Sequence, residues 1–360
     1  MSTSALTECP AGGVLLVGSV PLPTAEAVMR RCGAEFGEHL RTLPDGEVGD
    51  RRYWVNRMHF RVFNGHADIE IVQRPRPDNG IERRIPHGIE DIWKFRVRAG
   101  VDAVRFGDPG ERLGYAQDAI ASWFAFRTLK EQGVIPARVR FQVGMPLPIS
   151  AVSYVNWVNP DDVHKVRPGF TQALLAEVEA MLRHIPAEEL AIQLEAVWEL
   201  GDVYGHFPHL PAAGAVERNL QQIRDIAPCI PTGVALGYHL CFGTFGHWPR
   251  IASGDLAPAV ALGNAMIAAS GRPVDWLHLP AAPVVDEAYY APLGELSPQG
   301  ARVYLGLVHN MESFAERLAL ARRYCPDFGL SAYCGFGRLQ DAELDQVFSD
   351  HAEALRQAGS

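Results

Sequence analysis

Short runs of apolar and β-branched residues recur along the chain, and longer segments with helical spacing separate most of them. Runs of this length and composition are typical of buried strands. Eight of them are found, at residues 13–20, 102–107, 137–144, 190–195, 233–239, 274–279, 302–308 and 328–334. Helices are expected at 111–132, 170–184, 213–226, 256–270, 312–323 and 341–357.

Strands that alternate with helices pair in parallel, and eight such units predict an α/β fold of the (β/α)8 TIM-barrel type. A length of 360 residues suits a single barrel domain, residues 1–360. A doubly wound open sheet is the alternative, and it would normally carry a Gly-rich phosphate loop after its first strand. The first turn here reads VGSVPLPT, residues 17–24, which lacks that pattern and therefore favours the barrel.

The connection between the first two expected strands is too long for a simple loop. It contains an expected helix at 24–36, a second helical piece around 48–62 and an Arg- and Pro-rich stretch at 74–88. Long insertions at the ligand-facing end of a scaffold are usually lids or binding loops. We therefore expect a lid-like insertion at about 37–100, after the first strand, with a surface or oligomer contact as the alternative.

Charge and cysteine usage narrow the class of partner. The formal net charge is −9, which argues against nucleic acid or an anionic membrane surface as a partner. The chain has neither an apolar run of 18 residues nor the pattern of a signal peptide at its start. Six cysteines spread over 360 residues do not resemble a disulfide framework, so we expect a cytoplasmic protein.

Polar residues with useful chemistry gather at the carboxyl ends of the expected strands, where a barrel of this type binds its ligand. They are Ser19 after the first strand, Glu195 after the fourth, His239 and Cys241 after the fifth, His278 in the sixth, His309 after the seventh and Cys334 after the eighth. Cys9, Cys32, Cys229 and Cys325 fall elsewhere and are expected to be structural or surface thiols.

His239, Cys241 and Cys334 form a set of soft metal ligands. One imidazole and two thiolates suit zinc, and three protein ligands leave one position open, as in catalytic zinc sites. Two thiolates make the metal poor at producing hydroxide but well suited to lowering the pKa of an incoming thiol. The alternative is that these residues belong to the core, where buried cysteine is common.

Five short motifs together resemble the C-terminal catalytic barrel of cobalamin-independent methionine synthase, within a superfamily that also holds uroporphyrinogen decarboxylase. The motifs are VGSVPLPT (17–24), PDGEVGDRRYWV (44–55), IQLEAVWE (192–199), HLC (239–241) and YCGFGR (333–338). The resemblance implies that zinc is held by His239, Cys241 and Cys334. It also implies that Ser19 contacts the carboxylate of homocysteine, and that Glu47 and Glu195 hold the amine.

The chain departs from the family pattern at several points. The family's further zinc ligand is a Glu, but WLHLPAAP at 276–283 has none, and His278 is the nearest substitute. Asp45 replaces a usual His, and Glu195 replaces a usual Asp. The chain also lacks the N-terminal barrel that holds folate in full-length synthases, so a folate, a corrinoid protein or a small molecule could be the alkyl donor.

We therefore expect a zinc-dependent S-methyltransferase or S-alkyltransferase acting on homocysteine or a related amino thiol, with His278 and His309 as candidate catalytic proton acceptors. A thiol–epoxide adding enzyme like the coenzyme M transferases is the closest alternative, and Arg51, Arg52 and Arg338 would suit its sulfonate. A metal-free decarboxylase of the uroporphyrinogen type and a non-enzymatic zinc or corrinoid-partner protein are the others.

Three residues also have structural alternatives. Ser19 could cap the helix that follows it. Glu47 could be a carboxylate favoured by a helix N-terminus. His278 could be a hydrogen-bonded histidine of the core.

Overall fold

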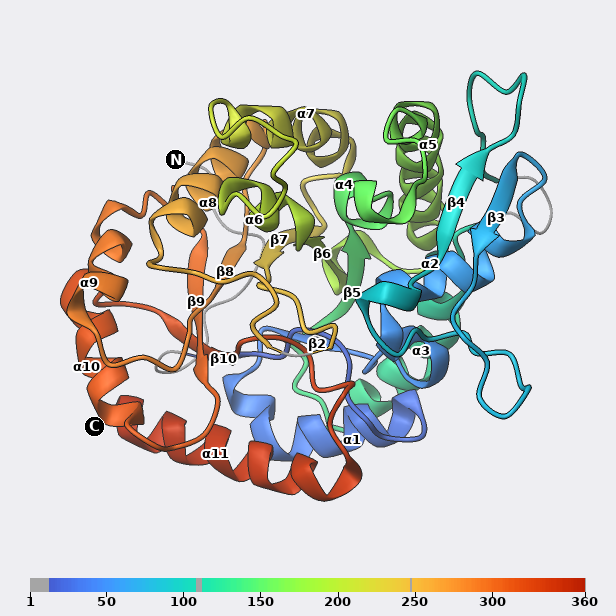
Figure 1. The fold of residues 1–360 in the computed structure, drawn as a ribbon. Coiled ribbons are helices and arrows are strands. Elements are labelled where there is room, and N and C mark those ends of the chain that lie inside the picture. The colour runs from blue at the N-terminus through green and yellow to red at the C-terminus, as the bar shows by residue number, and fades with distance from the viewer. Residues whose placement is uncertain (1–12, 108–111, 247, 360) are drawn as a thin grey trace.

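The computed structural model describes residues 13–107, 112–246 and 248–359; Cys9 lies outside these ranges. Eight parallel strands form a nearly closed barrel, with helices around its outside (Figure 1). The barrel fold that the alternation of strands and helices predicts is therefore confirmed. No helix among the described residues is both long and apolar enough to cross a membrane.

The barrel strands follow one another around the sheet in the order β1-β10-β9-β8-β7-β6-β5-β2. A parallel bridge between Val14 and Leu40 links the two ends of this order and brings the barrel near closure. The strands are β1 (Val14–Leu15), β2 (Thr42–Pro44), β5 (Arg140–Pro146), β6 (Leu190–Ala196), β7 (Ala235–Leu240), β8 (Trp276–Pro280), β9 (Arg302–Val308) and β10 (Gly329–Ala332).

The second barrel strand is not where the sequence pattern placed it. Residues 102–107 form no strand, and β2 lies instead within the stretch that was expected to be a lid. Val104 is buried because this segment packs on α5 (Asp162–Leu182), where the Val104 N–H donates to the Lys165 carbonyl at 2.9 Å. The insertion therefore follows the second strand, not the first.

The insertion between β2 and β5 is built from helix and hairpin. It contains α2 (Val55–Arg61) and an antiparallel pair, β3 (Ile69–Gln73) with β4 (Lys94–Val97), and it ends at α3 (Tyr115–Glu131). The hairpin projects to one side of the barrel, beyond α5 (Figure 1). Because α2 lies over the mouth of the barrel, this segment supplies part of the cavity wall.

The expected helices are present with shifted ends. The helix predicted at 170–184 starts eight residues earlier, at Asp162, because it continues through Pro168. The helices are α1 (Ala25–Phe36), α3 (Tyr115–Glu131), α4 (Pro148–Ala151), α5 (Asp162–Leu182), α6 (Trp198–Val203), α7 (Ala215–Ile226), α8 (Ala257–Ala269), α9 (Glu287–Tyr290), α10 (Phe314–Tyr324) and α11 (Asp341–Gly359).

Trp276 fills the part of the barrel interior that lies nearest the amino ends of the strands. It is the first residue of β8 and packs in a cluster with residues from four other strands, Leu15, Ala191, Ala235 and Tyr304. Its ring occupies the space above Gly237, where a Cβ would lie only 1.8 Å from the indole. The barrel is therefore packed at the amino ends of its strands, and its free volume is at the carboxyl ends.

Candidate active site

A cavity of about 130 Å³ opens at the carboxyl ends of the strands. Its wall is formed by the ends of the barrel strands, by α2 of the insertion and by the loops after β7 and β10. Six of the residues singled out in the sequence line it together: Ser19, Glu47, Glu195, His239, Cys241 and Cys334. The other two, His278 and His309, lie behind its wall.

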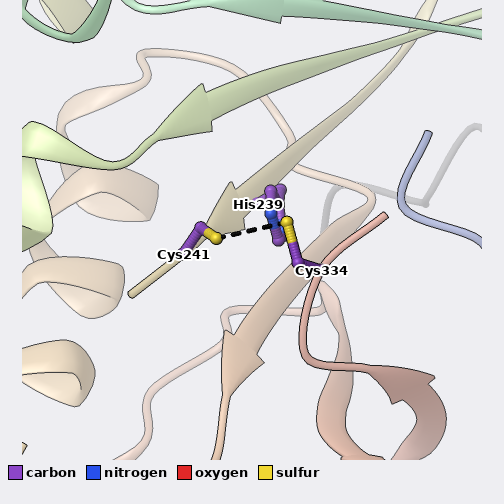
Figure 2. A group of neighbouring side chains, drawn as sticks. All are labelled: His239, Cys241 and Cys334. Atoms are coloured by element: carbon purple, nitrogen blue, oxygen red, sulfur yellow. Dashed lines mark hydrogen bonds between the residues drawn. The ribbon is translucent and has the colours of Figure 1, made fainter. Parts of the chain in front are cut away.

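The three soft ligands converge although they come from strands that are not neighbours. His239 and Cys241 lie on one face at the end of β7, since side chains two residues apart point the same way. Cys334 follows β10 and reaches them across the mouth, so that the ligand atoms of all three lie within 4.8 Å of one another (Figure 2).

Both cysteines of this set are free thiols. The Cys241 and Cys334 sulfur atoms are 3.4 Å apart, much longer than a disulfide bond of about 2.05 Å. Cys241 donates its S–H to Cys334, and this bond raises the pKa of Cys241 and lowers that of Cys334. A metal ion that binds both sulfurs as thiolates would displace the proton of this bond.

His278 determines which nitrogen of His239 is free. The two residues face each other across β7 and β8, with 2.8 Å between their Nδ1 atoms. The His278 Nε2 atom lies 3.0 Å from the Ala332 carbonyl, which can only accept, so Nε2 carries the proton. Burial lowers the pKa of both rings, that of His278 to about 4, so both are neutral. His278 Nδ1 then accepts from His239 Nδ1–H, and His239 Nε2 keeps its lone pair.

This donor set fits zinc. Two sulfur atoms at about 2.3 Å from a tetrahedral zinc lie about 3.8 Å apart, close to the observed separation. The free imidazole lone pair completes three of the four positions, as in a catalytic site. Both nitrogens of His278 are engaged in hydrogen bonds, so it does not join the cluster as a fourth ligand.

His309 is also turned away from the cavity. Its Nε2 donates to the Ala281 carbonyl at 2.7 Å, and its ring stacks on Tyr333 at a centroid distance of 4.9 Å. Burial lowers the pKa of His309 to about 4. Neither histidine predicted as a proton acceptor therefore faces the space in which a ligand would bind.

Two carboxylates converge on the side of the cavity formed by β2, β5 and β6. A Cβ at Gly144 would lie 2.5 Å from Glu195 Oε1 and 2.9 Å from Glu47 Oε1, so the missing side chain makes room for both acids. Burial raises the pKa of Glu47 to about 8, and Asp45 adds to the shift. Burial also raises the pKa of Glu195 far above its usual range, and the nearby Glu47 carboxylate adds to the effect.

Asp45 holds the turn that presents Glu47. Glu47 has φ +46°, in the left-handed region that residues other than glycine rarely adopt. The Asp45 carboxylate accepts from the Glu47 N–H at 2.9 Å, from Arg51 at 2.7 Å and from the Ser122 hydroxyl at 2.6 Å. Asp45, which stands where the resembled family has His, thus binds the backbone of this turn.

Ser19 is packed against the loop that follows Cys334. Its Oγ accepts from the Gly337 N–H at 3.2 Å, and its carbonyl accepts from the Phe336 N–H at 2.6 Å. The helix that follows is capped by Thr24, whose Oγ1 accepts from the Ala27 N–H. The helix-cap interpretation of Ser19 is therefore wrong.

Several cavity residues were not identified as site residues from the sequence. Trp54 and Trp198 lie within two of the quoted motifs, but the resemblance assigned them no role, and His59 comes from the insertion. Arg250 lies in the loop after β7, near the two cysteines but outside any motif. Of the three arginines considered in the sequence, Arg52 and Arg338 line the cavity, whereas Arg51 is bound to Asp45.

No family model matches the chain, and no curated protein matches it. Among solved structures, a B12-independent methionine synthase from Shewanella sp. W3-18-1, in complex with selenomethionine, superimposes with a TM-score of 0.56. The two chains are 12% identical, over 96% of this chain and 98% of that one. A D-psicose 3-epimerase, solved in the presence of D-fructose, has a TM-score of 0.40 and 11% identity over 69% of this chain and 87% of that one.

At 12% identity, the likeness to the methionine synthase shows a shared fold: this chain is a TIM-type barrel over nearly its whole length. The epimerase is too distant to carry an argument.

Proposed function

We propose that this protein is a zinc-dependent transferase that places a methyl or other alkyl group on the sulfur of an amino thiol. The observation that carries the proposal is one cavity that contains an imidazole, two thiols and two carboxylates. Zinc bound there would lower the pKa of a coordinated thiol, which would then react as a thiolate at neutral pH. The barrel shared with a methionine synthase supports this interpretation.

The metal ligands have distinct tasks in this proposal. Cys241 and Cys334 supply two negatively charged sulfurs once they are deprotonated, and His239 supplies its Nε2 lone pair. His278 keeps His239 in the tautomer that can bind a metal, and so acts as a positioning residue. His239, Cys241 and Cys334 all line the cavity, so a metal bound to them would be accessible to a thiol that enters it.

Glu47 and Glu195 select the amino group of the thiol. In the empty cavity their raised pKa values mean that the pair retains protons near neutral pH. An ammonium group between them would favour ionisation of both carboxylates and release those protons. Homocysteine has a thiol and an amine, and we propose it or a related amino thiol as the acceptor.

The alkyl donor is open among a folate, a corrinoid protein and a small methylated molecule.

Cys32, Cys229 and Cys325 are all free thiols, which suits the reducing cytoplasm that we propose as the location. A metal-free decarboxylase would leave the His239, Cys241 and Cys334 cluster without a role.

A thiol–epoxide adding enzyme is the second candidate, since Arg52 and Arg338 line the cavity and would suit a sulfonate. Calorimetric titration of zinc-loaded protein with homocysteine and with 2-mercaptoethanesulfonate separates the two candidates. Tighter binding of homocysteine supports the amino thiol. Tighter binding of the sulfonate would reject it, and binding of neither thiol would reject the whole class.

A further inference from the structure

Three arginines line the cavity without a carboxylate partner. Their neighbours are neutralised: Arg51 pairs with Asp45, and Arg57 pairs with Asp118. By contrast, within residues 13–107, 112–246 and 248–359 no carboxylate lies within ion-pair distance of Arg52, Arg250 or Arg338. Three guanidinium groups therefore line one site without forming an ion pair with a carboxylate.

The side chains of these three arginines line neighbouring parts of the cavity mouth. A Cβ at Gly337 would lie 2.9 Å from the Arg52 Cβ, so Arg52 is packed beside the Arg338 segment. Arg52 and Arg338 also line the open hollow just outside the cavity. A Cβ at Gly243 would lie 3.3 Å from the Arg250 Cβ, which places Arg250 in contact with the same β7 loop that Arg338 reaches.

Arg338 is oriented by the β7 loop. Its Nε donates to the Thr244 hydroxyl at 2.9 Å, and its guanidinium lies 5.7 Å from the centre of the Phe245 ring. These contacts use one edge of the guanidinium and fix its plane. Its two terminal nitrogens have no hydrogen-bond acceptor among the described side chains, and they remain free for a ligand.

A buried donor in the same wall also lacks an acceptor. Arg250 Nε is shielded from solvent and has no hydrogen-bond partner. Buried polar groups are normally hydrogen-bonded, so an unpaired donor in a cavity wall points to an acceptor that a ligand supplies. Because this donor belongs to one of three positively charged guanidinium groups at the cavity, the acceptor is expected to be an anion.

We propose that Arg52, Arg250 and Arg338 form an oxyanion subsite for a carboxylate, sulfonate or phosphoryl group. The group is carried by a molecule whose reacting atom lies at His239, Cys241 and Cys334. That second part rests on the proposed function, whereas the binding of an anion does not. The anion belongs either to the thiol or to the alkyl donor, and both sources share this chemistry.

The test compares two thiols that differ only in the anion. Zinc-loaded protein is titrated calorimetrically with 2-mercaptoethanesulfonate and with 2-mercaptoethanol. If the thiol carries the anion, the sulfonate binds at least about tenfold more tightly, and Arg338→Gln and Arg250→Gln remove most of that advantage. Arg127→Gln removes an exposed charge on α3 that pairs with Glu131, and as the matched control it leaves the advantage intact.

A second titration tests the donor as the source of the anion. Inorganic sulfate and methyl phosphate are added to protein saturated with 2-mercaptoethanol. If the donor carries the anion, one of these binds alongside the thiol, and the same arginine variants weaken its binding about tenfold or more. Arg52→Gln serves as a third variant if either of the others fails to fold by circular dichroism.

The subsite is rejected if no anion binds and the sulfonate gives no advantage. It is also rejected if all the variants bind anions as the wild type does. Sulfate is in addition titrated into protein without thiol, so that the result is independent of the transferase chemistry. Sulfate binding without thiol binding would reject the proposed function and support the anion subsite. Thiol binding without any anion effect would reject the anion subsite and leave the proposed function standing.

Discussion

The Nδ1 atoms of His239 and His278 lie 2.8 Å apart on adjacent strands, and this contact leaves the Nε2 lone pair of His239 free. In metal sites such a partner fixes both the tautomer and the orientation of the ligating ring. The sequence resemblance suggested His278 as the substitute for a missing Glu ligand. In the structure His278 instead lies behind His239 and is hydrogen-bonded to the Ala332 carbonyl.

Replacing His278 should weaken zinc binding without removing a ligand. His278→Phe keeps a ring in the core but loses the acceptor for His239 Nδ1–H, so we expect about 10- to 100-fold lower zinc affinity. Competition with a chromophoric chelator measures this affinity directly. His278→Asn can still accept from His239 and should recover part of it.

His309→Phe is the matched control for that experiment, because His309 is another buried histidine bonded to a backbone carbonyl. It should bind zinc as the wild type does. Equal zinc affinity of His278→Phe and wild type would show that the contact between the two histidines has no influence on the metal.

Cys334→Ser should reduce zinc in purified protein from about one per chain to a small fraction. The reason is that a serine hydroxyl is a far poorer zinc ligand than a thiolate. Elemental analysis provides the measurement. Cys325→Ser, at a buried cysteine outside the cluster, should retain full zinc. A Cys334→Ser protein with full zinc would remove Cys334 from the ligand set.

Gly144→Ala should impair recognition of the amine. The new Cβ would fall within 3.0 Å of both Glu47 and Glu195, so the two carboxylates must separate. We expect roughly tenfold weaker binding of homocysteine, about 1.4 kcal/mol, and little change for 4-mercaptobutyrate, which lacks the amine. Gly65→Ala, where an added Cβ meets nothing within 4 Å, is the control. Equal losses for both thiols would contradict a role of the acids in binding the amine.

Glu47→Gln should stabilise the empty protein at alkaline pH while weakening homocysteine binding. Burial raises the pKa of Glu47 to about 8, above its value of 4.5 in the unfolded chain. The unfolded state therefore loses the proton first as pH rises, and stability falls between about pH 4.5 and 8. Gln has no proton to lose, so the melting temperature of Glu47→Gln should equal that of the wild type at pH 4. It should exceed the wild-type value most above pH 8. Thermal melts at both pH values check this, and an advantage that is equal at both would contradict it.

The fold could be predicted because most barrel strands are long enough to leave a pattern. The run at 302–308 coincides with β9, and the run at 190–195 covers most of β6. The sequence pattern did not reveal β2, because its three residues, Thr-Leu-Pro, are too few to show any periodicity. The apolar run at 102–107 was misleading because Val104 is buried by packing on α5 without any strand neighbour.

The candidate site could be predicted where its residues lie at strand ends. His239 and Cys241 share a face because they are two residues apart at the end of β7, and only the barrel topology was needed to place Cys334 opposite them. The partner of His278 depends on the register of β7 with β8, and the convergence of Glu47 and Glu195 depends on an empty position at Gly144. Neither relationship is encoded in a local pattern.

Trp276 gives the cavity a closed floor, and this has a kinetic consequence. Since the indole fills the barrel above Gly237, a ligand has no passage through the amino end and must enter and leave by the mouth. Arg52 and Arg338 line both the cavity and the hollow just outside it, so a second molecule bound there would obstruct access to Glu47 and Glu195. For the proposed transferase, this predicts a compulsory order in which the amino thiol binds first and its alkylated product leaves last.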